Sequence, residues 1–450
     1  MPTVCYAKAT FDFLPEKAVV AQFDGGTLTS DAGLLLLAQL ERRVGLIRRM
    51  AECLIDKRDP RKVKVALEEM LKQRIFGIAA GYEDCNDHDT LCADPMLKVA
   101  AGRCPESDDD LASQPTLSRF ENRVTRRELV RMAYALLDDF IDDHVTRPPK
   151  RIVLDVDATD DPTHGQQELE GFHGYYETHC YVPAFCFASC DDGPHEPILG
   201  VLRPGRIHAS RGVPGLVRRY VLRIRGAMPS TTMVFRADAG MAIPEIYSTC
   251  ESLGMGYAIG LIRNAVLERL AEPFVQQAKQ LFEETQRTVQ VFGEFDYQAE
   301  TWPHARRVVV KAEIIASHKD EVNLRFVVTD GMQLSPEDLY EFYVQRGDVE
   351  SRIDELKNDC FSGRTSCHRF LANQFRLLMH LAAYRLLVLL RRHLRDPQLA
   401  VAQVETLRVR VIKVAAKVVE SVRRVLFSLA GNYPWIDDWL DAAVVVGGVV

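Results

Sequence analysis

The sequence predicts an α/β protein whose mixed β-sheet is flanked in the chain by helical N-terminal and C-terminal regions. Two observations lead to this fold class. Apolar residues recur at helical spacing before residue 150 and after 331, whereas short β-type runs alternate with helical segments between them. With 450 residues, 47% of them hydrophobic, the chain is long enough for two or three domains, each with its own core.

The clearest domain boundary is the Pro148-Pro149 step, because proline disfavours a helical conformation in the residue before it. Four regions are predicted beyond the helical N-terminal region 1–150. These are the first part of an α/β core at 151–262, an inserted β-rich subdomain at 263–330, the last part of the core at 331–395, and a C-terminal helical region, a candidate for dimerisation, at 396–450.

The composition indicates a cytoplasmic protein. The N-terminus lacks the pattern of a signal peptide, and no apolar run reaches the roughly 18 residues of a membrane span. The eleven cysteines include no C-x-x-C pair, which favours reduced thiols. Zinc binding by Cys186 and Cys190, or by Cys85 and Cys92 near His88, is a weaker alternative, because no second pair stands at matching spacing.

The net charge of −7 argues mildly against a nucleic-acid partner, but basic residues are concentrated locally. Residues 203–225 contain seven arginines and no acid, and residues 376–424 contain eleven Lys or Arg against three acids. Such stretches can follow a phosphate backbone, which makes Arg203 and Arg206 candidate DNA contacts. Solvated helix faces are the alternative.

Two predicted strands end in aspartate. In IVLDVDAT, Asp155 and Asp157 stand two residues apart, so both carboxylates point to one side near the strand's C-terminal end, and MVFRADAG brings Asp238 to a second strand end. Ligand sites of α/β sheets lie at such ends, and adjacent carboxylates are costly without a cation. The alternatives are solvated aspartates for the first segment and a turn cap for Asp238.

The strongest single feature is a predicted helix after Ser335. At 100° per residue, with Arg346 as zero, Tyr343 falls at about +60°, Glu350 at about +40° and Lys357 at about +20°. A carboxylate with cations and a hydroxyl on one stripe suits a phosphodiester site. The alternative is a surface stripe in which an i, i+4 pair contributes only about 0.3–0.5 kcal/mol. A glycine inside the helix, Gly347, would suit close approach of DNA or of a neighbouring backbone.

The spacing Tyr343, Arg346, Glu350, Lys357 resembles the helix signature of bacterial insertion-sequence transposases of the DDE type. The segments LDVDATDDPTHGQQ and FRADAGMAIPEIY look like the blocks around that family's first and second aspartates. The resemblance covers roughly 110–395, and it implies a catalytic core with the RNase H-like (retroviral-integrase-like) fold.

The resemblance also implies roles for single residues. Asp157, Asp238 and Glu350 would be the catalytic, metal-binding triad, with Asp155 the competing candidate for the first position. Tyr343, Arg346 and Lys357 would contact phosphates at the transposon ends. Trp302, in the inserted subdomain, would stack on an extruded base, or it is a core tryptophan.

The implied activity is cleavage of transposon ends and strand transfer into target DNA with two Mg²⁺ ions, for which Mn²⁺ would substitute. The implied partners are the terminal inverted repeats and the target DNA, bound by a homodimer in a synaptic complex. Residues 1–150 and the basic stretches would recognise the ends, and the bound protein would be nucleoid-associated.

Two other functions remain open at this point. A haloacid-dehalogenase-like phosphatase would use Asp155 as its nucleophile, but that class predicts an acid about four residues after the late aspartate, where this chain has Ala242. A domesticated DNA-binding protein would keep the fold without cutting.

Overall fold

The computed structural model describes residues 8–318 and 321–448, and the chain divides into two compact units. Unit 1 comprises Met1–Leu129, Asn358–Arg364 and Ala382–Val450; unit 2 comprises Val130–Lys357 and Thr365–Leu381. Residues 1–7, where the absence of a signal peptide was inferred, lie outside the described residues. The division falls inside helix α7 (Arg126–His144), earlier than the Pro148-Pro149 step.

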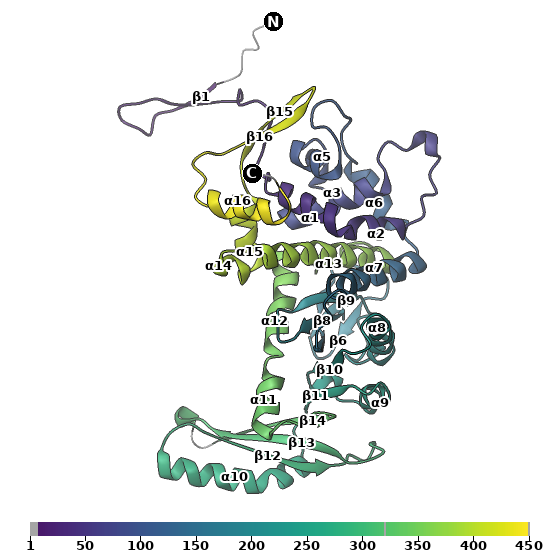
Figure 1. Cartoon of the computed structure of the whole chain (residues 1–450), viewed down its shortest axis with the longest axis vertical. Coiled ribbons are helices and arrows are strands. Elements are labelled where there is room, and N and C mark those ends of the chain that lie inside the picture. Colours follow the sequence, from purple (N-terminus) through teal and green to yellow (C-terminus); the bar gives the residue numbers. More distant parts are fainter. Residues whose placement is uncertain (1–7, 319–320, 449–450) are drawn as a thin grey trace, which may run out of the picture. The chain divides into compact units, whose positions relative to one another are not determined.

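Unit 2 is built on an eight-stranded mixed sheet (Figure 1). The strands in spatial order are β12 (Val289–Tyr297), β13 (Arg306–Ile314), β14 (Val322–Asp330), β11 (Gly256–Leu261), β10 (Thr232–Ala237), β4 (Arg151–Ala158), β8 (Ala184–Cys190) and β9 (Glu196–Val201). The mixed α/β class and the strands expected from their apolar runs are thus confirmed.

The centre of this sheet brings two strand ends together. Strand β10 runs parallel to β4 and to β11, whereas β8 is antiparallel to β4. The register pairs Arg236 with Asp155 and Ala237 with Val156. The residues that follow, Asp157 and Asp238, therefore emerge next to each other at the carboxyl ends of neighbouring parallel strands.

Alternation along the strands divides the core into two layers. One face, with Leu154 and Phe235 among its buried residues, packs against helices α7, α8, α9 and α10. The opposite face carries Val153 and Val234 and packs against Leu339 and Phe342 of helix α11. The helices of unit 2 that follow α7 are α8 (Val213–Ala227), α9 (Pro244–Ser252), α10 (Ala265–Thr285), α11 (Pro336–Val344), α12 (Gly347–Asp354) and the first part of α13 (Phe370–His393).

The β-rich segment predicted at 263–330 as an inserted subdomain extends the central sheet instead. Its strand β14 pairs antiparallel with β11, and β13 and β12 continue from there. Val309 and Val327 belong to the same core layer as Val153. The run lengths predicted the strands, but strand pairing depends on contacts far apart in the sequence.

The single helix expected after Ser335 is interrupted. Helix α11 ends at Val344, α12 begins at Gly347, and a π-helical turn covers Glu355–Asp359. At the first break the N–H of Arg346 donates to the carbonyl of Tyr343, three residues back rather than four. The helix start itself is as expected, because the Ser335 side chain caps the N–H of Asp338.

Three short strands of unit 2 form a small separate sheet. It has the order β5 (Asp161–Pro162), β7 (Thr178–Tyr181) and β6 (Gly171–His173). It occupies the connection between β4 and β8, and its β6–β7 turn carries Tyr175 and Tyr176.

Unit 1 is mainly helical in its N-terminal part, as predicted. Its helices and turns there are α1 (Leu34–Val44), α2 (Leu46–Glu52), a 3-10 turn (Pro60–Lys62), α3 (Leu67–Ala80), α4 (His88–Leu91), α5 (Pro95–Ala101) and α6 (Gln114–Asn122). They follow three strands that the apolar pattern did not predict: β1 (Lys8–Phe11), β2 (Val19–Gln22) and β3 (Leu28–Thr29).

The prediction of a helical region at 396–450 is wrong in part. Besides helices α14 (Pro397–Ala400), α15 (Val404–Leu407) and α16 (Ile436–Val445) and a π-turn (Arg408–Ile412), it contains the hairpin β15 (Ala416–Ser421) and β16 (Arg424–Leu429). Strand β15 also pairs with β3 from the other end of the chain. The β-branched residues of KVVES and RVLF favour strands, and a partner so distant in sequence completes the sheet.

Within the described residues, no helix combines the length and the apolar composition needed to cross a membrane.

Candidate active site

A cavity of about 660 Å³ in unit 2 lies at the carboxyl ends of β4 and β10. Its walls include Asp157, Asp238 and Glu350 together with Arg346. The structure therefore brings the three carboxylates predicted from sequence to one hollow, although they come from chain segments more than 80 residues apart.

The two aspartates differ in how they are held. Asp157 stands near the end of β4, and one of its oxygens accepts the N–H of Ala158 at 2.8 Å. Asp238 follows β10 and caps a 3-10 turn, Ala239–Met241, where its Oδ1 accepts the N–H of Gly240 at 3.0 Å. The turn-cap alternative for Asp238 is thus also true, and the cap fixes this carboxylate beside the cavity.

The pKa of Asp157 is raised to about 7, chiefly by burial and then by the neighbouring charges of Asp238 and Glu350, against the opposing effect of Arg346. The carboxylate is only 16% exposed. Three carboxylates beside one arginine form a site with an excess of negative charge. A cation would relieve that excess.

Arg346 lies between two members of the predicted triad. Its Nη1 is 3.3 Å from Asp157 Oδ2, and its Nη2 donates to Glu350 Oε1 at 2.5 Å. The guanidinium is 18% exposed, whereas the Glu350 side chain is 56% exposed. The i, i+4 pair expected as the alternative is present, and the contact with Asp157 connects it to the sheet.

Asp155 is excluded from the cavity. Its carboxylate is fully buried and accepts two hydrogen bonds from Arg236, Nε to Oδ1 at 2.6 Å and Nη2 to Oδ2 at 2.9 Å. His195 Nε2 is a further 3.1 Å from Oδ2. Because both oxygens are engaged and no solvent reaches them, Asp157 is the better candidate for the first ligand position.

Tyr343 rests on the sheet beside the second aspartate. A Cβ on Gly260 of β11 would lie 2.5 Å from the Tyr343 hydroxyl and 3.3 Å from the backbone nitrogen of Ala239. Glycine at 260 therefore makes room for this hydroxyl next to the turn that holds Asp238.

Lys357 extends to the loop after β4 rather than along a continuous helical stripe. Its Nζ contacts Thr159 Oγ1 at 3.1 Å, the carbonyl of Asp160 at 2.9 Å and Asp160 Oδ1 at 3.1 Å. This places a positive charge near the first aspartate. The π-helical turn at Glu355–Asp359 alters the angular spacing that was assumed for an unbroken helix.

Of the predicted DNA contacts, Tyr343 and Lys357 do not line the cavity, and the remaining three also lie outside its lining. Trp302 is buried in the core, 6% exposed, with its ring against Tyr247 and Tyr297, which favours the core alternative over base stacking. Arg203 is also buried, and it donates to the carbonyls of Val182, Ala209 and Arg211, so its guanidinium does not face solvent. Burial lowers its pKa to about 10. Arg206 is exposed and lies across Gly171.

The sequence analysis missed the aromatic wall of the cavity, which consists of His173, Tyr175 and Tyr176. Tyr176 donates its hydroxyl to the carbonyl of Ala158 at 3.2 Å, beside Asp157. Tyr175 packs edge to face on Tyr176, with 84% of its own surface exposed. The GFHGYYETH segment showed this aromatic cluster, but only the fold places it beside the carboxylates.

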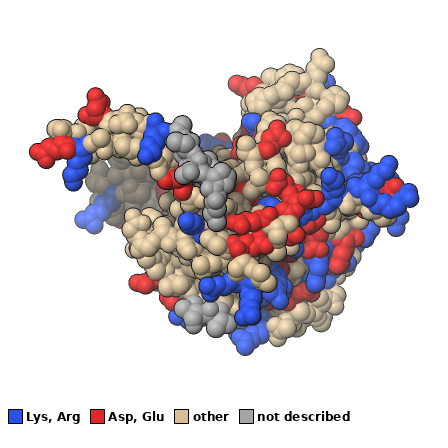
Figure 2. Space-filling view, turned by 90° about the horizontal axis from the view of Figure 1, so that it is seen from above, with Lys and Arg blue, Asp and Glu red and all other residues tan. Residues whose placement is uncertain are grey.

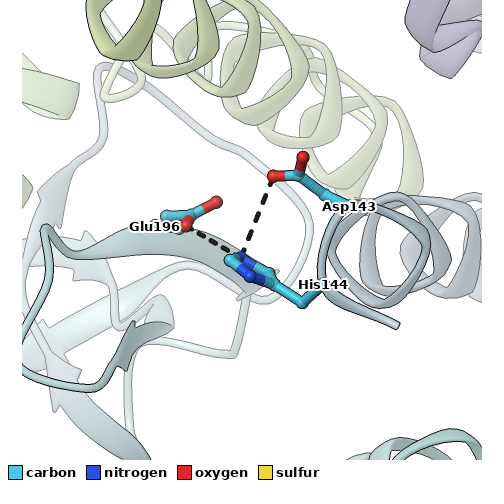
Figure 3. Close-up of side chains that lie close together, drawn as sticks. All are labelled: Asp143, His144 and Glu196. Atoms are coloured by element: carbon cyan, nitrogen blue, oxygen red, sulfur yellow. Dashed lines mark hydrogen bonds and ion pairs between the residues drawn. The ribbon is translucent and has the colours of Figure 1, made fainter. Parts of the chain in front are cut away.

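One group of described side chains has ligand atoms close enough to share a metal ion, and it lies elsewhere. It consists of Asp143 and His144 at the end of α7 and Glu196 at the start of β9 (Figure 3). His144 Nε2 is 3.0 Å from Glu196 Oε1 and 3.8 Å from Asp143 Oδ2. Two carboxylates that face one imidazole nitrogen fit a metal site, and they fit equally well a histidine that pairs with acidic side chains and binds no metal. No other described group, the predicted triad included, has its ligand atoms within 4.8 Å of one another.

The zinc alternatives find no support among the described residues. Cys186 is buried in β8, and neither Cys186 and Cys190 nor Cys85 and Cys92 with His88 form a metal-sized group. His88 instead contacts Gln73 Nε2 at 3.2 Å, and burial lowers its pKa to about 3.

The basic stretches do not form an uninterrupted basic surface. Arg223 pairs with Asp138, and Arg408 is buried, where its Nε donates to the carbonyl of Ala79. Figure 2 shows one face on which a band of Asp and Glu side chains lies among Lys and Arg. Exposed positive charge on the described residues is therefore confined to local groups.

No curated protein matches the chain. A family model described as transposase DDE domain group 1 matches residues 11–445. The chain belongs to this family of transposases.

Proposed function

We propose that the protein cleaves the ends of a transposable element and joins them to target DNA, with Asp157, Asp238 and Glu350 as the catalytic carboxylates. The observation that supports this most is their convergence with Arg346 on one cavity. We also infer that unit 2 has the RNase H-like fold. The order β9-β8-β4-β10-β11, with β8 antiparallel to β4 and with β4, β10 and β11 parallel, supports that inference.

The residues present fit a divalent metal centre. Three carboxylates line the cavity with a single arginine, Arg346, and burial together with the neighbouring acids raises the pKa of Asp157. Oxygen ligands of this kind suit Mg²⁺, with Mn²⁺ as its substitute. Held by Asp157, Asp238 and Glu350, two such ions would supply Lewis-acid activation for phosphodiester cleavage. When two ions are bound, the ligand atoms of all three carboxylates need not lie close together. This agrees with a triad whose ligand atoms do not all lie within 4.8 Å of one another.

The other residues of the cavity would bind and orient DNA. Arg346 brings positive charge to Asp157 and Glu350, which favours a bound phosphodiester and the charge that develops during in-line displacement. Lys357 lies outside the cavity lining, where it contacts Thr159 and Asp160, and would add a second cation near the end of β4. Water adds across the first phosphodiester and leaves a 3′-hydroxyl and a 5′-phosphate. The 3′-hydroxyl then attacks a target phosphodiester and displaces the 3′-hydroxyl of the target strand, so this second step forms one phosphodiester bond for each one that it breaks.

The substrates would be the terminal inverted repeats and the target duplex, held together by a homodimer. Residues 1–150 would contribute to recognition of the ends, as exposed basic side chains such as Arg206 would. The site of action would be the cytoplasm, at the nucleoid.

The test is cleavage of a duplex taken from the DNA that flanks the gene. Wild-type protein with Mg²⁺ should cut it, and Asp157→Ala, Asp238→Ala and Glu350→Ala should each lower the rate at least about a thousandfold, as expected for removal of a group needed in the transition state. Circular dichroism should show that the variants remain folded. Cleavage at the wild-type rate by all three would refute the assignment.

Burial of Asp155 disfavours the phosphatase alternative, since a nucleophile must reach its substrate. Release of inorganic phosphate from a small monoester, lost in Asp155→Asn, would restore it. A domesticated, non-cutting protein would instead bind the flanking duplex without cleaving it under any divalent ion.

A further inference from the structure

A buried charge cluster lies behind the cavity, on the same face of the sheet. Arg236 is 2% exposed and Asp155 1% exposed, and they form the two hydrogen bonds described above. His195, 8% exposed, approaches both: its Nε2 is 3.1 Å from Asp155 Oδ2 and 3.3 Å from Arg236 Nη2. Each charged residue stands two positions before a predicted metal ligand, Asp155 before Asp157 and Arg236 before Asp238.

The remaining nitrogen of Arg236 reaches out of the sheet to the helix break. Nη1 donates to the carbonyl of Phe342 at 2.6 Å and lies 3.4 Å from Gln345 Oε1. The guanidinium also stacks 4.8 Å above the Phe342 ring. In a continuous helix the Phe342 carbonyl would accept the N–H of Arg346, but that N–H is donated to Tyr343. Arg236 thus satisfies the carbonyl that the break releases.

The connection matters for the position of Glu350. Helix α12 starts immediately after the break, and its direction sets where Glu350 points. Asp157 and Asp238 are held at the ends of paired strands, whereas the Glu350 side chain, within the described part of the chain, hydrogen-bonds only to Arg346 of the same helical segment. The contacts of Arg236 with Phe342 and Gln345 tie the break between the two helices directly to β10.

We propose that Arg236, held by Asp155 and His195, is a positioning residue that fixes the break between α11 and α12 and thereby brings Glu350 to the metal ligands on the strands. This deepens the proposed function and rests on it. A planar guanidinium is suited to the task because it presents several donors in fixed directions, two for Asp155 and one for Phe342.

The experiment measures Mn²⁺ binding by the full-length protein without DNA, by electron paramagnetic resonance of the free ion. Arg236→Lys keeps the charge but cannot make all three hydrogen bonds. Loss of a group that orients a metal ligand typically weakens metal binding by about 10–100-fold, so we expect the Kd for Mn²⁺ to rise at least about tenfold. Amide hydrogen exchange over 345–354 should become faster in the same variant.

A second variant guards against loss of folding. Asp155→Asn with Arg236→Gln removes both charges, so no buried charge is left unpaired. It should stay folded and show the same weaker Mn²⁺ binding and faster exchange.

Arg306 provides the matched control. It is an equally buried arginine of unit 2, pairs with Glu251 at 2.8 Å and stacks on Tyr247 and Trp302, far from the helix break in its contacts. Arg306→Lys should lower the melting temperature but leave the Kd for Mn²⁺ and the exchange of 345–354 unchanged.

The proposal is overturned if both Arg236 variants bind Mn²⁺ as the wild type does and exchange at the wild-type rate, or if Arg306→Lys produces the same changes. Failure of the proposed function gives a different result. In that case Asp238→Asn would leave Mn²⁺ binding unchanged, and hydrogen exchange alone would still decide whether Arg236 holds the break.

Discussion

Among single residues, Asp157 combines a structural cost with its proposed function. Its pKa is raised from 3.8 to about 7, so the folded state binds its proton more tightly than the unfolded state does. Stability therefore falls as the pH rises from about 4 to 7, and the full penalty remains above pH 7. A metal ligand that lies near other carboxylates is expected to destabilise the folded protein while no ion is bound.

We predict that Asp157→Asn stabilises the protein in a chelating buffer at pH 8. The pKa shift, which already includes the opposing effect of Arg346, corresponds to about 4 kcal/mol at 1.36 kcal/mol per unit, and this is the upper limit of the expected gain. Urea unfolding at pH 8 and pH 4 measures it, and the gain should disappear at pH 4. Asp296→Asn, at an exposed position on β12, serves as the control and should show no such pH dependence. Equal stability of Asp157→Asn and wild type at pH 8 would contradict the argument.

For single residues, the sequence predicted which carboxylates line the cavity, but it did not predict which side chains pack around them. Strand ends and helical periodicity are local properties, so they made Asp157, Asp238 and Glu350 candidates, and the resemblance to DDE transposases grouped them as a triad. Residue spacing left Asp155 in competition with Asp157, since two residues on one side of a strand differ only in what packs over them. Burial of Asp155 under Arg236 depends on a partner 81 residues away.

At the scale of elements, the contact between α11 and β11 depends on a glycine in β11, Gly260. Tyr343 sits where any Cβ on Gly260 would intrude. We predict that Gly260→Ala displaces Tyr343 and costs about 1–3 kcal/mol of stability, the usual range for overpacking. The melting temperature and the cleavage rate should both fall.

A double variant tests the cause. Tyr343→Phe removes the hydroxyl that the new methyl group would strike, so the Gly260→Ala, Tyr343→Phe pair should recover much of the lost stability. Additive losses would show that Gly260 is needed for another reason, such as its closeness to Ala239.

The elements themselves show where sequence reasoning ends. Strands β4, β10 and β11 and the start of α11 were predicted because apolar runs and capping residues mark them locally. The break at Gln345 and Arg346 was not, since a helical stripe assumes an unbroken helix, and a guanidinium from β10 stabilises the interruption. The hairpin β15–β16 was missed because its basic residues were interpreted as a helix face.

For the molecule as a whole, net charge and function oppose each other. A protein of net charge −7 must bind a polyanion through local groups, and the cavity itself contributes three carboxylates. Divalent ions bound by these carboxylates should therefore decide whether the cavity repels or attracts DNA.

We predict a reversal of affinities on metal removal. In EDTA, the Asp157→Asn, Asp238→Asn variant should bind the flanking duplex more tightly than wild type, because two repelling charges are gone. In Mg²⁺ the wild type should bind more tightly. Fluorescence anisotropy at one fixed KCl concentration measures both, and the same order of affinities under both conditions would count against a metal centre at these residues.

The separation of the carboxylates along the chain also has a consequence during synthesis. Asp157 and Glu350 are 193 positions apart, and helix α12 follows every strand of the central sheet. At a translation rate of about 5–20 residues per second, roughly 10–40 s pass between the two. A nascent chain therefore carries both strand aspartates for several seconds before it has the third carboxylate, and under the proposed function it would be unable to cut DNA until that helix is made.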